Sequence, residues 1–269
     1  MWDAKSPLHL HQMHDLSGGR ESSTPREVWL QDINHPSVNQ LLKTPLRGLL
    51  LTCCNLHIDR FADSSIAFVI LRMQEIFNYA LYDQPHVVRE VIGFGGPMDE
   101  LPLMLHDFAI EMVWAPMVKL VGEALGKPVD KIAVEVERLP LERSIEVPGM
   151  GGFAAGSQGA FRFELQGYHA GKKLYVLEHV TRIDDACAPH WPYPPQGSGC
   201  HQVIISGDPD LHVTLHAQDH HEPGAAGGGN ASAASWVVNT VPAVCAARSG
   251  VITVLDLPRI TGAAQLQIG

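Results

Sequence analysis

The residue types best suited to lining a site occur together in residues 75–85, with the sequence EIFNYALYDQP. This segment follows an apolar run and presents an amide (Asn78), two phenols (Tyr79 and Tyr82) and a carboxylate (Asp83). Loops at strand ends that carry polar aromatic residues often line pockets. The same residues can also pack a turn, and the pattern leaves both alternatives open.

A second cluster combines imidazoles with carboxylates. Two histidines on one face of a strand, with a carboxylate in the following loop, can hold zinc. The chain has no HExxH motif and no cysteine pair near this cluster, so we interpret it as an exposed strand face that leads into a polar loop, and we predict no metal site. The cluster comprises His212, His216, Asp219, His220, His221 and Glu222.

Glu178 and His179 form a polar pair inside a strongly patterned strand. Together they are candidates for an acid–base dyad. Adjacent residues of a strand point to opposite faces, so a dyad between these two would require a bulge.

Two glycine-rich stretches, GFGG at 93–96 and GMGG at 149–152, invite comparison with phosphate-binding loops. A dinucleotide fingerprint needs GxGxxG between a strand and the start of a helix. The first stretch runs into Pro97 and the second leads into a predicted strand, and no GxxxxGK[ST] motif occurs. We therefore predict no cofactor-binding residues and no complete Rossmann domain in this chain.

The elements that position these residues follow from hydrophobic periodicity. Alternation of period 2 predicts strands at 132–137, 161–166, 174–183 and 211–217, and apolar runs predict strands at 66–77 and 251–257. Helical spacing predicts helices at 87–92, 106–125 and 232–247, with a break or a new start at Pro116 and a glycine loop at 224–229. The sum is an α+β fold in which a largely antiparallel, mixed sheet carries helices on one face.

Composition and charge limit the class of protein. The formal net charge of −10 disfavours nucleic acid and anionic membrane surfaces as partners, and no apolar run is long enough to span a bilayer. Five cysteines without a CxxC pair favour a reduced, cytoplasmic protein. Residues 1–48 lack periodicity and are expected to be an irregular, disordered leader, so the α+β domain is expected to occupy residues 49–269.

Four blocks of sequence carry a resemblance to a known family. They are MQEIFNYALYDQP (73–85), IGFGGPMDELPLML (92–105), VLEHVTRIDDACAPHWPYPP (176–195) and VVNTVPAVCAARSGVITVLDLPRITG (237–262). In this order they resemble a group of NAD(P)-dependent oxidoreductases that includes 2,4-diaminopentanoate dehydrogenases, native amine dehydrogenases and dihydrodipicolinate reductase-like proteins.

The resemblance implies a two-domain enzyme that transfers hydride between a nicotinamide and the carbon of an amine or imine. In such an enzyme a Rossmann domain holds NAD(P), and an α+β domain binds the substrate and forms the dimer. We expect this chain to be only the second part, a truncated protein that does not bind NAD(P) alone and whose main proton-transferring carboxylate lies in the missing part. We expect a homodimer and a small amine or amino-ketone substrate; the alternative is a non-catalytic binding or dimerisation module.

The resemblance and the loop position together suggest five substrate-binding residues. Asn78, Tyr79 and Tyr82 would line the pocket, Trp114 would form an apolar wall, and Asn239 would lie at a helix end. Phenol and amide groups can orient an ammonium or imine without the desolvation cost of a second buried charge. Asn239 can equally be a helix residue bonded to the backbone.

Overall fold

The structure is a computed structural model, and it describes residues 67–82, 84–220, 227–258 and 260. All of these residues belong to one compact unit, Pro45–Gly269. The leader predicted at residues 1–48 lies outside the described residues, and its boundary at residue 48 stays a prediction.

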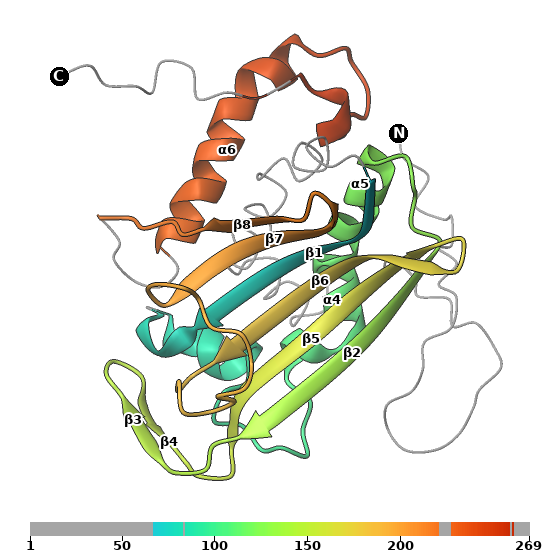
Figure 1. The fold of residues 1–269 in the computed structure, drawn as a ribbon. Helices are drawn as coiled ribbons and strands as arrows, with labels where there is room; N and C mark the ends of the chain where they lie inside the picture. Colours follow the sequence, from blue (N-terminus) through green and yellow to red (C-terminus); the bar gives the residue numbers. More distant parts are fainter. Residues whose placement is uncertain (1–66, 83, 221–226, 259, 261–269) are drawn as a thin grey trace, which may run out of the picture. The chain divides into compact units, whose positions relative to one another are not determined.

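A six-stranded mixed sheet forms the centre of this unit, in the order β2-β5-β6-β1-β7-β8 (Figure 1). Its strands are β1 (Ala67–Asn78), β2 (Lys131–Pro140), β5 (Gln158–His169), β6 (Lys172–Arg182), β7 (Gly199–Asp208) and β8 (Leu211–Leu215). Only β1 and β6 pair in parallel, while the other neighbours in this sheet are antiparallel. Two short strands, β3 (Ile145–Val147) and β4 (Gly151–Phe153), form a separate hairpin. The predicted α+β class with a mainly antiparallel sheet is confirmed.

The hairpin between β5 and β6 shows why local sequence was informative. Its two connecting residues, Ala170 and Gly171, have φ values of 48° and 76°. Two consecutive residues with positive φ form the type of tight turn whose twist matches that of the flanking strands. The alternating residues 161–166 and 174–183 therefore become neighbouring antiparallel strands, as predicted.

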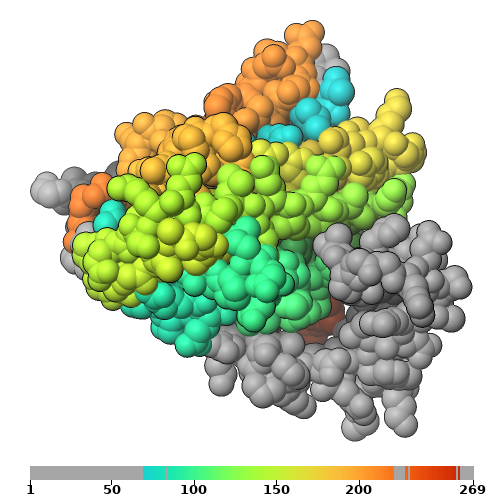
Figure 2. Space-filling view, turned by 90° about the horizontal axis from the view of Figure 1, so that it is seen from below, coloured from blue at the N-terminus to red at the C-terminus, as the bar shows by residue number. Residues whose placement is uncertain are grey.

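Two helices, α4 (Asp107–Val113) and α5 (Ala115–Ala124), pack on one face of the sheet, which is the far face in Figure 1. Figure 2 shows the teal-to-green segment that contains them on one side of the light-green edge strand β2. Glycine at position 167 permits the close approach of α5, because a Cβ there would lie 2.6 Å from Val118 Cγ1. The helix predicted at 106–125 divides at Trp114, since Pro116 lacks an N–H and its ring obstructs the carbonyl of Met112.

The helix-covered face of the sheet carries the apolar core. Alternation along each strand places one set of side chains beneath α4 and α5, and these side chains are almost fully buried. The set includes Leu71, Met73, Phe161, Phe163, Leu165, Tyr175 and Leu177.

The opposite face of the sheet carries charges that pair across four strands. Arg72 of β1 contacts Glu164 of β5 and Glu178 of β6, each at 2.7 Å. Arg162 lies 3.9 Å from Glu178 and 3.6 Å from Glu137. These interleaved charges make the second face polar while leaving Glu178 nearly inaccessible.

The last predicted strand is wrong. Residues 251–257 contain a short 3-10 helix, η5 (Val254–Asp256), instead of a strand. Thr253 accepts a hydrogen bond from the Leu255 N–H, and Asp256 accepts one from the Thr253 N–H, so a capping box turns the chain.

The predicted glycine loop at 224–229 is also partly wrong. Helix α6 (Gly227–Ala246) begins within it, while residues 224–226 lie outside the described residues. A Cβ at Gly228 would lie 2.2 Å from the Ala217 carbonyl oxygen, so glycine is needed there for close packing of this turn. Among the described residues, no helix is long and apolar enough to cross a bilayer.

Candidate functional site

Three titratable side chains come together at the middle of the sheet. Glu75 of β1 is in register with His179 of β6 on one side and with His201 of β7 on the other. Each belongs to the set that points toward α4 and α5, because Glu75 alternates in phase with Met73 and Phe77. Strands from three distant parts of the sequence thus converge on one carboxylate.

The contacts of Glu75 are short and fully enclosed. His179 Nδ1 lies 2.9 Å from Glu75 Oε2, and Trp114 Nε1 donates a hydrogen bond to the same oxygen at 3.1 Å. Glu75 and His179 have no exposed surface, and Trp114 is 1% exposed. We call Glu75, Trp114, His179 and His201 the Glu75 centre.

Aromatic rings fix the orientation of these groups. The His179 imidazole stacks against Phe161 and Phe163, with centroid distances of 5.8 and 5.2 Å. The Trp114 indole meets Phe163 edge to face at 4.9 Å. The rings therefore hold His179 Nδ1 and Trp114 Nε1 toward Glu75, and no bulge is needed for a carboxylate–imidazole pair.

Burial and charge act in opposite directions on these groups. Burial by itself raises the pKa of Glu75, but the hydrogen bond and charge of His179, with smaller contributions from His201 and Trp114, lower that pKa overall. Burial lowers the pKa of His201 more than the charge of Glu75 raises it. The centre therefore favours an ionised Glu75 beside a neutral His201.

Several polar atoms next to Glu75 have no hydrogen-bond partner within the described part of the chain. They are His179 Nε2, His201 Nε2 and Thr181 Oγ1. A buried polar atom without a partner costs free energy, and such atoms concentrate at sites that bind a ligand or water. The centre thus retains hydrogen-bonding capacity at His201 Nε2 and on the side of the His179 ring away from the carboxylate.

One of the five predicted site residues belongs to the Glu75 centre, and two more are connected to it through a series of aromatic contacts. Trp114 belongs to it, although through an indole hydrogen bond and not only as the predicted apolar wall. Tyr79 is buried, with its ring 5.1 Å from that of Tyr82 and 6.2 Å from that of Phe77. Phe77 in turn lies 5.2 Å from His201, so an aromatic series joins the two tyrosines to the centre. Burial raises the pKa of Tyr79 well above its ordinary value, and the phenol therefore stays protonated.

Asn78 and Asn239 lie elsewhere. Asn78 caps the 3-10 helix η2 (Tyr79–Leu81) by accepting a hydrogen bond from the Ala80 N–H at 2.8 Å. Its Nδ2 donates to Asp185 at 2.6 Å, so both ends of its amide hold the loop. Asn239 is half-buried in the interior of α6 and not at a helix end. Whether any of the five residues binds a substrate stays a prediction.

Sequence reasoning missed Glu75, His179 as its partner, and His201. Glu75 lies inside the block 73–85, and its alternation with apolar residues was a usable signal, because a carboxylate on a core-facing position needs a partner. The pairing with His179 had no local signal, since the two residues are 104 positions apart. His201 was not among the residues that the sequence pattern singled out.

The two glycine-rich turns do not fit the pyrophosphate of a dinucleotide. Gly93 and Gly95 follow a short π-helix, η3 (Val87–Val91), and Gly149 and Gly151 lie in the β3–β4 hairpin. Neither turn joins a strand to the start of a helix, which is what a bound pyrophosphate requires. We therefore assign no NAD(P) contact to the described residues.

The histidine cluster in residues 212–222 shows no metal geometry where it is described. His216 Nδ1 lies 2.9 Å from the Gly199 carbonyl oxygen, and His212 is exposed on β8. Over residues 67–220 and 227–258, without residue 83, no three His, Cys, Asp or Glu side chains are grouped to hold a metal ion. His221 and Glu222 lie outside the described residues.

The fold has a counterpart among the solved structures. It aligns with the solved structure of an amine dehydrogenase from Mycobacterium smegmatis with a TM-score of 0.51, over 80% of this chain and 58% of that one. At 16% identity, this similarity establishes the fold alone. The architecture is thus that of an α+β domain found in a dehydrogenase.

Sequence comparison then identifies the family. Residues 109–267 match the 2,4-diaminopentanoate dehydrogenase C-terminal domain, and the chain belongs to this family. A protein described as an amine dehydrogenase from Streptomyces virginiae is 43% identical over 190 residues, which are 70% of this chain and 52% of that protein. The chain therefore spans about half the length of this curated relative. Trp114, His179 and His201 lie within the matched region, and Glu75 precedes it.

Proposed function

We propose that this chain is the substrate-binding and dimerisation part of an NAD(P)-dependent amine or diamino-acid dehydrogenase. It acts on a small amine or amino-ketone and needs a nucleotide-binding domain for activity. The observation that carries the proposal is the Glu75 centre, in which one buried carboxylate is surrounded by aromatic rings and imidazoles.

The chemistry of the Glu75 centre suits a cationic substrate group. Removal of hydride from the carbon that bears an amine leaves an iminium cation. A carboxylate in a water-poor site stabilises such a cation, and aromatic faces add cation–π attraction. His179 holds Glu75 in one orientation, and neutral His201 is available to accept a proton.

Binding of an amine tests this assignment. Cyclohexylamine should bind the full chain in calorimetry, and cyclohexanol, its neutral analogue, should bind at least about tenfold more weakly. Because Glu75 is fully buried, the amine enters only when covering side chains move, so association should be slower than diffusion allows.

Two variants localise the amine. Glu75→Gln should abolish cyclohexylamine binding, whereas Glu164→Gln, which removes a carboxylate from the opposite face of the sheet, should preserve it. Equal binding by the wild type and Glu75→Gln would remove the Glu75 centre from the proposed function.

A cofactor-binding measurement distinguishes a chain that needs a separate nucleotide-binding domain from one that holds the cofactor itself. NADH or NADPH added to the purified chain should change neither its intrinsic fluorescence nor its Tm, since neither described glycine turn fits a pyrophosphate. A Kd below about 100 μM for either nucleotide would contradict the proposal that a separate domain supplies the cofactor site.

The polar face of the sheet supports the proposed homodimer. Its more exposed charges, Arg162 and Glu137, can meet their counterparts on a second copy with opposite signs facing each other. Light scattering should give twice the chain mass of 29.3 kDa at micromolar concentration. Thr214→Arg on this face should weaken the dimer, and Glu123→Arg on α5 should not.

A non-catalytic module of the same fold is the alternative function. It is favoured if the dimer forms but no amine binds at the Glu75 centre.

We also propose a cytoplasmic location, which the free thiols of Cys187, Cys200 and Cys245 support.

A further inference from the structure

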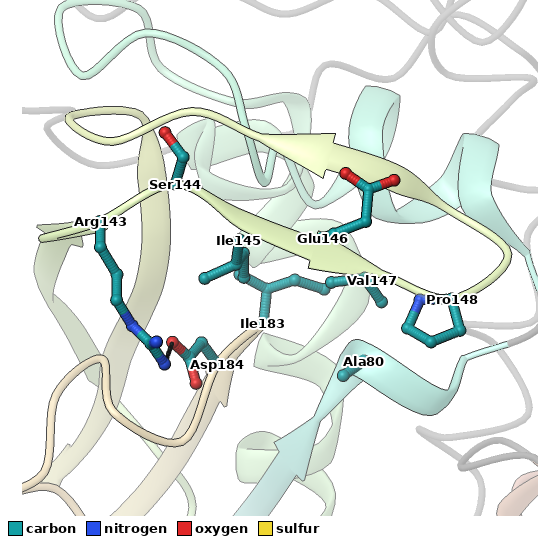
Figure 3. A pocket seen from close by; sticks show the side chains of 9 residues that line it. All are labelled: Ala80, Arg143, Ser144, Ile145, Glu146, Val147, Pro148, Ile183 and Asp184. Atoms are coloured by element: carbon teal, nitrogen blue, oxygen red, sulfur yellow. Dashed lines mark hydrogen bonds and ion pairs between the residues drawn. The ribbon is translucent and has the colours of Figure 1, made fainter.

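A cavity of about 400 Å³ lies between the β3–β4 hairpin and the end of β6 (Figure 3). This volume is within the range of pockets that hold small molecules. The cavity is distinct from the Glu75 centre, with which it shares no lining residue. Its walls are Ala80, Arg143, Ser144, Ile145, Glu146, Val147, Pro148, Ile183 and Asp184.

The floor of the cavity is apolar and rigid. Ile145 and Val147 of β3 point toward Ile183, while Ser144 and Glu146 point to the other side of the hairpin strand (Figure 3). Ile183 is 1% exposed and Val147 is 4% exposed, so both belong to the packed core. The half-buried Ile145 supplies most of the accessible apolar surface of this floor, and a branched aliphatic group of a few carbons would lie against it.

One end of the cavity carries two opposite charges. Arg143 Nη2 lies 3.4 Å from Asp184 Oδ2, which is a long contact, and the Arg143 side chain is 71% exposed. An exposed pair of this kind contributes little to stability. Asp184 is better fixed, because its Oδ1 accepts a hydrogen bond from the Ala186 N–H.

This pair of charges discriminates between kinds of ligand. A ligand with only a carboxylate would be attracted by Arg143 and repelled by Asp184. A ligand with only an ammonium group would be attracted by Asp184 and repelled by Arg143. A molecule with both an ammonium and a carboxylate on one carbon gives each protein charge an opposite partner.

The geometry points to a binding site for an apolar α-amino acid, with its ammonium on Asp184, its carboxylate on Arg143 and its aliphatic side chain over Ile145, Val147 and Ile183. This assignment does not depend on the proposed dehydrogenase function. Ala80 connects the two regions, since it lies in η2 beside Tyr79. Occupancy of the cavity would thereby restrain the loop that carries the aromatic series.

Calorimetry with three related probes tests the site on the full chain. L-Leucine carries both charges, 3-methylbutylamine lacks the carboxylate, and 4-methylpentanoate lacks the ammonium. L-Leucine should bind saturably, and each analogue should bind at least about tenfold more weakly, because each loses a charge-assisted contact. The three probes are compared in the Glu75→Gln variant, so that amine binding at the Glu75 centre does not contribute.

Variants of the charged pair provide the second half of the test. Arg143→Met and Asp184→Asn should each weaken L-leucine binding by about tenfold or more. Glu123→Gln removes a charge from an exposed position of α5, which does not line the cavity, and should leave binding unchanged. Arg143 is largely exposed, so its variant should fold, and circular dichroism verifies this.

Three results would overturn the assignment. They are no saturable L-leucine binding up to about 10 mM, analogues that bind as tightly as L-leucine, and an Arg143→Met variant that binds like the wild type. Cyclohexylamine binding at the Glu75 centre should survive Arg143→Met, so failure of this site and failure of the proposed function are distinguishable.

Discussion

Replacing Glu75 by glutamine removes one negative charge from the interior without changing the size of the side chain. The two donors that meet on Glu75 Oε2, His179 Nδ1 and Trp114 Nε1, then face a neutral amide oxygen. Both hydrogen bonds then lose the charge assistance that the carboxylate supplies.

The expected loss of stability follows from these two hydrogen bonds. Hydrogen bonds to a charged group contribute about 1.5–3 kcal/mol, against about 1 kcal/mol for neutral ones, and disruption of a buried pair costs about 3–5 kcal/mol. We expect Glu75→Gln to lower the free energy of unfolding by about 2–4 kcal/mol. For a domain of this size, that corresponds to a fall in Tm of about 5–15 °C.

Urea unfolding at pH 7 measures this loss, and a double-mutant cycle assigns it. His179→Phe keeps a ring against Phe161 and Phe163 but removes both imidazole nitrogens. The coupling energy between the Glu75 and His179 substitutions should be about 1–3 kcal/mol, as found for residues in direct contact.

The pH dependence gives an independent control. Because the pKa of Glu75 is lowered from 4.5 on folding, its ionised form stabilises the protein above that value, and this contribution disappears as the pH falls through the lowered pKa. The difference in the free energy of unfolding between the wild type and Glu75→Gln should therefore become smaller below pH 4.5. Two results would refute the role given to this carboxylate. One is a free energy of unfolding for Glu75→Gln within about 0.5 kcal/mol of the wild-type value at pH 7, and the other is a difference between the two that does not change with pH.

Three further substitutions follow from the same geometry. Burial lowers the pKa of His201 from 6.5, so the free energy of unfolding should decrease as the pH falls below 6.5. In urea unfolding, His201→Leu should show a smaller decrease in this free energy between pH 7 and pH 5 than the wild type. Trp114→Phe removes the indole hydrogen bond to Glu75 and should cost about 1.5–3 kcal/mol at pH 7 in the same assay. Gly167→Ala places a Cβ 2.6 Å from Val118 Cγ1 and should lower the unfolding free energy by about 1–3 kcal/mol, whereas an unchanged Tm would contradict the close approach of α5.

Local patterns in the sequence were sufficient for most of the sheet. Residues 161–166 and 174–183 alternate with period 2 around Ala170 and Gly171, and a strand pair with a tight turn needs nothing more than such local information. The helix break near Pro116 is likewise local, because it arises from the missing N–H of proline. The four separated sequence blocks were specific enough to indicate the family.

Two other features were predicted wrongly, one because of a local cap and one at a turn that packs against a distant backbone segment. Residues 251–257 are apolar enough for a strand, but the hydrogen bonds between Thr253 and Asp256 turn the chain into a 3-10 helix. The sequence predicted that Gly228 lies in a loop, but in the structure it lies in α6 and packs against the Ala217 backbone. In both cases the local composition admits two conformations, and the neighbouring groups select one.

The Glu75 centre is the clearest product of tertiary structure. Sequence alone placed Glu75 and His179 in two strands, with side chains on alternating faces. Only the parallel pairing of β1 with β6 brings the carboxylate and the imidazole to 2.9 Å, and only the packing of α4 and α5 on the sheet adds Trp114. A parallel pair joins segments that are distant in sequence, so its register is set by the global packing of the sheet and not by the residues between them.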